Sequence, residues 1–174
     1  MMKKLMTCLL ASAAIVAAMP EAFAGNLGVI DAQQILYTSN AGKRLKASLE
    51  KAKENGEKKI ADMEAKLAKQ QEELMRKKSL LTEEKYLEEE ATLKKAVRDY
   101  RVEAQGIQDS IDRELTIGRK EILDAIREAV NEISADRKFD LVMNNAQLMY
   151  HSDSVDITND VLAKVNARLD KKSK

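Results

Sequence analysis

The sequence predicts a mainly helical protein in which a long antiparallel helical hairpin projects from a small body of short strands. Aromatic residues make up only 3% of the chain and charged residues 34%, with a single proline, which is the composition of long helices. Apolar residues recur every three or four positions in the middle of the chain, and the period changes to that of strands at both ends. Such a chain buries little apolar surface alone, so we expect the body to self-associate.

The first 24 residues have the features of a cleaved export signal. Lys3 and Lys4 precede an apolar stretch at 5–18, and Ala-Phe-Ala at 22–24 matches the small-residue cleavage motif. A membrane anchor is the alternative, but this stretch is shorter than the roughly 20 residues that a span needs. We therefore expect cleavage after residue 24 and export from the cytoplasm.

The N-terminal half of the processed chain is predicted to begin with a strand at 27–31, where apolar and β-branched residues follow a glycine. A partly helical connection at 32–40 leads into a helix from 41 to about 78. A second helix is expected from 83 to about 136. A short connection between two long helices favours an antiparallel hairpin, with its tip near 79–82.

A stripe of apolar and small residues, spaced three or four positions apart, is expected to join the two helices. Three of its members, Gly56, Gln71 and Gly118, weaken it, and we expect the arm to bend there. At the tip, Thr82 is expected to cap the second helix through its hydroxyl. The stripe consists of Leu49, Ala52, Gly56, Ile60, Met63, Leu67, Gln71 and Leu74 in the first helix, and of Leu93, Val97, Tyr100, Ala104, Ile107, Ile111, Leu115, Gly118, Ile122, Ile126, Ala129 and Ile133 in the second.

The C-terminal segment is predicted to return to the body. Strand-like runs at 139–143 and 148–151 flank a turn at 144–147, which is the pattern of a hairpin. With the strand at 27–31 they would form one small sheet. Thr158 is expected to cap a last amphipathic helix. The expected organisation is therefore a body from 25–40 and 137–170, an arm at 41–136 and a solvated tail at 171–174.

The inventory of reactive side chains argues against an enzyme. His151 is the only histidine, and Cys8 is the only cysteine and lies in the predicted signal. Without a second histidine, a further cysteine or a glycine-rich phosphate loop, metal and nucleotide chemistry lack their usual groups. We therefore expect no catalytic residue, no metal and no cofactor.

Charge limits the range of partners. Removal of residues 1–24 leaves 28 basic and 28 acidic side chains, so the processed chain is neutral. A neutral chain has no overall attraction for nucleic acid or anionic lipid. We expect no nucleic-acid partner and at most a weak contact with membrane lipids.

Several segments together resemble the Skp (OmpH-like) periplasmic chaperones. These are Leu27-Gly28-Val29-Ile30-Asp31 followed by Gln34, the charged hairpin, Phe139-Asp140-Leu141-Val142, and Val155-Asp156-Ile157-Thr158 with Val161-Leu162. The resemblance implies a periplasmic homotrimer whose three arms enclose a cavity. It also implies ATP-independent binding of unfolded outer-membrane β-barrel proteins in that cavity. Family members are often strongly basic, whereas this processed chain is neutral.

Two sets of residues are candidates for these roles. Apolar side chains of the distal arm suit many weak contacts with an unfolded client, although Met63 and Leu67 can instead only seal the two helices together. The client-contact candidates are Met63, Leu67, Leu74, Met75, Leu80 and Leu81. The candidates for body core or assembly contacts are Val29, Ile30, Leu141, Val142, Leu148 and Val161.

Two other functions remain open on the sequence. A structural coiled-coil module of the cell envelope would share the export signal and the helices. A peripheral membrane-binding protein would also share them, but the neutral charge is unfavourable for it. The break at 79–82 and the return of the chain to one body favour the chaperone, because a stalk would use one uninterrupted helix.

Overall fold

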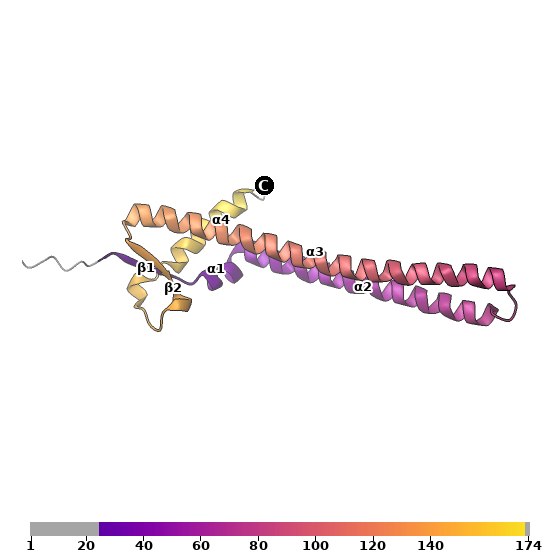
Figure 1. Cartoon of the computed structure of the whole chain (residues 1–174). Coiled ribbons are helices and arrows are strands. Elements are labelled where there is room, and N and C mark those ends of the chain that lie inside the picture. Colours follow the sequence, from indigo (N-terminus) through magenta and orange to yellow (C-terminus); the bar gives the residue numbers. More distant parts are fainter. Residues whose placement is uncertain (1–24, 173–174) are drawn as a thin grey trace, which may run out of the picture.

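A computed structural model describes residues 25–172 of the chain, so the predicted signal at 1–24 lies outside the described residues. A long two-helix arm extends from a small body that contains both ends of this region (Figure 1). The elements in order are β1 (Leu27–Ile30), α1 (Ala32–Thr38), α2 (Asn40–Lys77), α3 (Glu83–Arg137), β2 (Leu141–Asn144), the 3-10 helices Asn145–Gln147 and Asp153–Val155, and α4 (Thr158–Lys172).

The arm is the predicted antiparallel hairpin. Helix α2 has 38 residues and α3 has 55, which correspond to about 57 and 82 Å at 1.5 Å per residue. Every member of the predicted stripe except Gln71 is at least partly shielded from solvent. The periodicity therefore identified the buried face of both helices correctly, although the last stripe residues of α3 pack against α1 and α4 rather than against α2.

The two glycines of the stripe allow the arm helices to approach closely. A Cβ atom at Gly56 would lie 2.6 Å from Cγ2 of Ile107, and one at Gly118 would lie 2.6 Å from Cδ1 of Leu45. Both α2 and α3 continue unbroken through these positions. Because Gly56 and Gly118 have no side chain, Ile107 and Leu45 of the opposite helix can pack directly against their backbone.

The predicted side-chain cap at Thr82 is wrong. Thr82 precedes α3 with extended backbone angles, but its side chain makes no capping hydrogen bond. Its carbonyl oxygen accepts the hydrogen bond from the Tyr86 N–H. Because Thr82 is exposed, water can satisfy the remaining N–H groups of the first turn.

The sheet of the body has two strands, β1 and β2, and they run parallel. Leu27 pairs with Leu141 and Ile30 with Asn144 at the two ends of the register. The other side of β1 is occupied by an isolated parallel bridge from Val29 to Asp156. Parallel neighbours require a long crossover, and here the entire arm provides it.

Of the two strands predicted at 139–143 and 148–151, the first forms as β2 and the prediction of the second is wrong. Residues 145–147 form a 3-10 helix, in which the Leu148 N–H donates to the Asn145 carbonyl over 2.9 Å. The Asn144 side chain accepts a hydrogen bond from the Ala146 N–H and so begins this turn. The chain at 148–151 forms no strand, although the outer edge of β2 is open within residues 25–172, because the 3-10 turn at 145–147 is not the tight two-residue turn that brings an antiparallel strand back.

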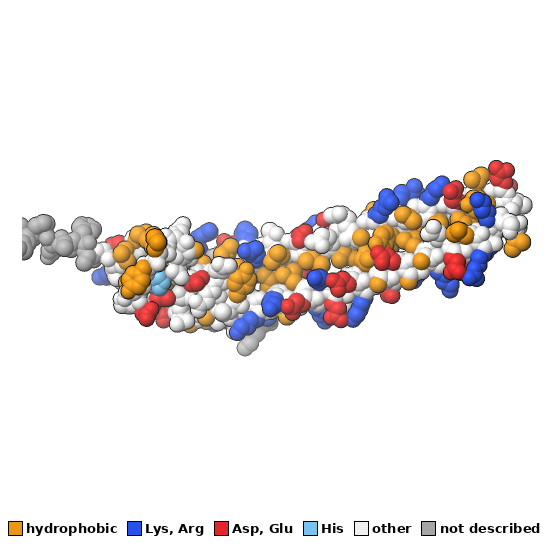
Figure 2. Space-filling model, turned by 90° about the horizontal axis from the view of Figure 1, so that it is seen from below, with side chains coloured by type: hydrophobic (Ala, Val, Ile, Leu, Met, Phe, Trp, Pro, Cys, Tyr) orange, Lys and Arg blue, Asp and Glu red, His pale blue; other side chains and the backbone are white. Residues whose placement is uncertain are grey.

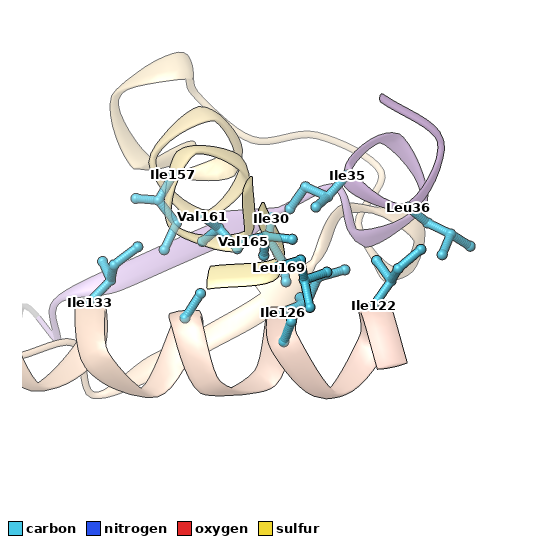
Figure 3. Close-up of a cluster of buried hydrophobic side chains, with 12 residues drawn as sticks. Ile30, Ile35, Leu36, Ile122, Ile126, Ile133, Ile157, Val161, Val165 and Leu169 are labelled. Carbon is cyan, nitrogen blue, oxygen red and sulfur yellow. The ribbon is translucent and has the colours of Figure 1, made fainter. Parts of the chain in front are cut away.

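The core lies where the arm enters the body. Helix α4 packs across the C-terminal part of α3, and α1 and β1 close the cluster (Figure 3). Ile35, Ala129, Val161 and Val165 have no exposed surface. The full cluster is Ile30, Ile35, Leu36, Ile122, Ala125, Ile126, Ala129, Ile133, Ile157, Val161, Val165 and Leu169.

Helix α4 is also fixed by ion pairs on its polar face. Arg168 pairs with Glu128 and Glu132 of α3, and Lys164 lies 3.0 Å from Glu132. The hydrogen bond from Lys164 to Glu132 raises the pKa of Lys164 above its ordinary value. The helix extends to Lys172 and so includes the first two residues of the predicted tail at 171–174.

None of the helices within residues 25–172 combines the length and the apolar character that a membrane crossing requires.

Candidate functional site: the distal arm

The contact between α2 and α3 is buried near the body and partly open toward the tip. Ile122, Ile126 and Ile133 are at most 4% exposed because α1 and α4 cover them. Farther out, Leu67 and Val97 are only half-buried, since no third element lies over them. Figure 2 shows apolar side chains running along the arm between basic and acidic ones. The distal arm therefore presents a long, narrow apolar surface to solvent.

One side of the distal contact forms a shallow groove with a volume of about 450 Å³. Its apolar part consists of Leu67 from α2 and of Leu93 and Val97 from α3. We call it the basic groove, because Lys94, Arg98 and Arg101 outnumber its one carboxylate. It is lined by Leu67, Gln71, Glu90, Leu93, Lys94, Val97, Arg98 and Arg101.

The opposite side of the same contact forms a smaller groove of about 200 Å³. It shares Leu93 with the basic groove and adds Leu74 from α2. We call it the acidic groove, because Glu73 and Glu89 are its only charged residues. Its lining consists of Gln70, Glu73, Leu74, Glu89, Thr92 and Leu93.

Large apolar side chains are exposed at and near the tip of the arm. Leu80 is 83% exposed and Met75 is 70% exposed, while Leu81 is half-buried. The Lys78 ammonium lies 5.6 Å from the centre of the Tyr86 ring, within the range of a cation–π contact. Adaptable apolar groups thus stand beside positive charge at the end of the arm.

The six client-contact candidates lie in different environments. Met75 and Leu80 are freely accessible, and Met63, Leu67 and Leu81 are half-buried. Leu74 is only 7% exposed, so most of its surface seals the hairpin. Some of these side chains therefore pack between the two helices and others are open to solvent, and the sequence alone did not show which.

Some exposed apolar residues were missed. Leu87, Val102, Ile117 and Leu123 of α3 are between 44% and 72% exposed. They lie off the stripe that joins the helices, and an apolar residue off the stripe of an otherwise charged helix was the signal that could have identified them.

Polar contacts across the hairpin hold the two helices in register. Lys59 lies 2.5 Å from Glu103, and the Tyr100 hydroxyl donates a hydrogen bond of 2.6 Å to Glu64. That hydrogen bond, together with partial burial and the Glu64 charge, raises the pKa of Tyr100 above its ordinary value. These contacts keep the apolar surface in place, and no cluster of three or more potential metal ligands occurs among residues 25–172.

The assembly candidates divide into a buried and an accessible set. Val29, Ile30 and Val161 are buried within one chain. Leu141 is 50% exposed, and Val142 and Leu148 are partly exposed. Nearby in sequence, Met149 and Tyr150 are almost completely exposed, although such residues are usually covered. The body therefore has an uncovered apolar surface around β2.

These features define a class of protein: a chain with a two-helix arm on a small body of short strands and helices, and with an extended apolar surface along the arm. The profile of the family described as outer membrane protein (OmpH-like) matches residues 26–165. The chain belongs to the OmpH-like family.

A solved structure has the same fold. It is the crystal structure of an OmpH-like protein from Caulobacter crescentus CB15, described as a proposed outer membrane chaperone. The TM-score is 0.76 at 16% sequence identity, and the match covers 83% of this chain and 85% of the other. A comparison with curated proteins gives no match.

Proposed function

We propose that this protein is an ATP-independent holdase chaperone of the periplasm, which keeps unfolded outer-membrane β-barrel proteins from aggregating. The half-open apolar contact of the distal arm is the observation that supports this most directly. A holdase must cover apolar segments of its client without a rigid pocket. The shallow grooves beside Leu67, Leu74 and Val97 and the exposed tip offer many such contacts.

Weak and repeated contacts suit release without an energy source. Burial of apolar surface contributes roughly 25 cal/mol per Å², so one side chain such as Met75 adds only about 1–3 kcal/mol. Met adapts to apolar partners of different shapes. A client held by several such contacts stays soluble and can still leave when its own folding offers more burial.

We further propose that three copies assemble through the body, so that the arms surround the client. The exposed residues Leu141, Met149 and Tyr150 and the outer edge of β2 are suited to this contact, because an uncovered strand edge tends to pair with another chain. The number three rests on the family resemblance. Self-association itself is favoured by the uncovered apolar surface.

The periplasmic location rests on the export signal expected at residues 1–24 and on the family. Residues 76–78 at the tip, Arg-Lys-Lys, also allow a weak contact with acidic lipid headgroups. The alternative function is a structural coiled-coil module, which needs sealed helices but has no use for exposed Met75 and Leu80.

Turbidity tests the proposal. A urea-unfolded barrel protein is diluted into buffer that contains the processed chain and no nucleotide. We expect the barrel protein to remain soluble, so that turbidity does not rise, and we expect protection to saturate at one barrel per three chains. Aggregation as fast as in buffer alone would reject the holdase function and favour the structural module.

A further inference from the structure

The two grooves of the distal hairpin differ in charge although they share Leu93. The basic groove carries three cationic side chains and one carboxylate, and the acidic groove is lined by two carboxylates, of which Glu89 lies 3.6 Å from the Lys77 ammonium. The neutral net charge of the processed chain therefore hides a local separation of charge. Each side of the arm offers a different environment to an approaching polypeptide.

Two arginines of the basic groove have no side-chain partner within the described part of the chain, residues 25–172. Lys94 lies 3.0 Å from Glu90, so these two charges satisfy each other. Arg98 and Arg101 form no ion pair or hydrogen bond with any side chain among residues 25–172. Leu67 and Gln71, which form the α2 wall, provide no carboxylate.

The position of these arginines suits recognition of a carboxylate. Residues three apart on a helix are neighbours on its surface, so both guanidinium groups can reach one site. Guanidinium binds carboxylate through two parallel hydrogen bonds, which gives orientation as well as attraction. The apolar side chains of Leu67, Leu93 and Val97 lie directly beside them.

We propose that the basic groove binds segments of unfolded polypeptide in which a carboxylate side chain neighbours apolar side chains. The inference rests on the proposed holdase function and specifies the segments that one side of the arm prefers. The acidic groove does not attract such segments, because its lining offers the Glu73 carboxylate, a Glu89 carboxylate already paired with Lys77, and no cation of its own.

Adjacent glutamines offer a matched pair of probes. Gln71 lines the basic groove, and Gln70 lines the acidic groove. The only cysteine is Cys8, so the processed chain carries none and Gln71→Cys and Gln70→Cys can each be labelled at one site. A benzophenone label at either position is exposed to two peptides with identical apolar residues, one containing Glu and the other Gln.

We expect the label at position 71 to crosslink the Glu peptide several-fold more than the Gln peptide, and the label at position 70 to show no such preference. The preference should shrink in high salt, which screens exposed charges. Equal crosslinking of both peptides at position 71, or the same preference at both positions, would overturn the inference.

Substitution of the arginines provides a second test. The double change Arg98→Gln and Arg101→Gln should weaken binding of the Glu peptide by about fivefold, the effect of two exposed ion pairs of moderate strength. Arg113→Gln is the control, because Arg113 is exposed on the same helix and lines neither groove. An equal loss in the control and the double variant would contradict a specific role of this groove.

The outcome is separable from that of the holdase assay. A chain that protects the barrel but does not distinguish the peptides keeps the proposed function and loses this inference. A chain that prefers the Glu peptide but fails to protect the barrel keeps the inference and loses the function. If the label at position 71 responds to anionic phospholipid vesicles and not to the Glu peptide, the groove binds lipid and the inference is wrong.

Discussion

The backbone N–H of Asp31 donates a hydrogen bond of 2.9 Å to the hydroxyl oxygen of Thr158, although 127 positions separate the two residues. The Asp31 carboxylate accepts a second hydrogen bond from the Gln34 N–H and so caps α1. Thr158, which is 3% exposed, opens α4. This one contact therefore ties the beginning of the N-terminal helix to the beginning of the C-terminal helix.

Removal of this acceptor should destabilise the body. Thr158→Val keeps the shape of the side chain but leaves the partly buried Asp31 N–H without its partner, which costs about 1–3 kcal/mol. Urea denaturation followed by circular dichroism measures the change. The control is Thr92→Val, whose exposed hydroxyl bonds only within α3, and its free energy of unfolding should change by less than about 0.5 kcal/mol.

Acid should lower the stability of the same region, because Asp156 then becomes protonated. The hydroxyl of Thr158 holds the pKa of the Asp156 carboxyl below its ordinary value of 3.8, its backbone N–H adds to the effect, and partial burial opposes it. A carboxyl whose pKa is lower in the folded state stabilises the fold above its ordinary pKa, and this contribution is lost as the pH falls through the folded value.

The stability difference between the natural chain and Asp156→Asn should therefore be largest at neutral pH and shrink below about pH 4. Urea midpoints of both proteins at pH 7 and pH 3 measure it. A difference that is the same at both pH values would show that the charge of Asp156 contributes nothing.

Two glycines of the arm should respond differently to substitution by alanine. No atom lies within 4 Å of the place that a Cβ at Gly106 would take, so Gly106→Ala should stabilise α3 by about 0.5–1 kcal/mol. Gly56→Ala meets the stiff β-branched side chain of Ile107, and this clash should cancel the gain. Thermal denaturation compares the two, and equal stabilisation would contradict the close packing at Gly56.

Assembly can be tested at Leu141. Leu141→Asp places a charge on a residue that is 50% exposed in one chain, so the chain should keep its helix content and lose its self-association. Ile30→Asp buries the charge inside the body core and should unfold that region instead. Light scattering gives the mass and circular dichroism the helix content; a Leu141→Asp protein that stays trimeric would refute this interface.

The distal tip should matter for client binding and not for folding. Met75→Ser combined with Leu80→Ser removes two exposed apolar side chains, so helix content should be unchanged while more chain is needed to prevent barrel aggregation, by several-fold. Ile117→Ser, at an exposed site closer to the body, is the comparison variant. A larger loss of protection in Ile117→Ser would show that the tip is not the main contact.

Much of the fold was predictable because local patterns dictate it. The spacing of three and four residues placed the contact between α2 and α3, and the parallel pairing of β1 with β2 agrees with the expectation that both chain ends form one sheet. The predicted strand at 148–151 failed because strand propensity does not make a turn: residues 145–147 form a 3-10 helix, and the outer edge of β2 stays unpaired within residues 25–172.

The role of Thr158 was predictable only in part. Its position before an amphipathic segment indicated a helix start correctly, but the predicted cap is wrong: the Thr158 hydroxyl accepts from the Asp31 N–H outside its own helix, and the Asp156 carboxylate accepts from the Thr158 N–H. Its actual bond to the Asp31 N–H depends on β1 and α4 meeting in space, which local sequence does not encode. The basic groove could not be predicted from the sequence either. Its walls come from two helices, and its charge depends on which residues of each helix face the same side.

The central claim is that assembled arms hold one unfolded barrel protein in solution. Size-exclusion chromatography with light scattering, after dilution of the barrel into the processed chain, tests it most directly. We predict one soluble complex with the mass of three chains and one barrel. Elution of the chain alone, with the barrel in the pellet, would contradict the claim.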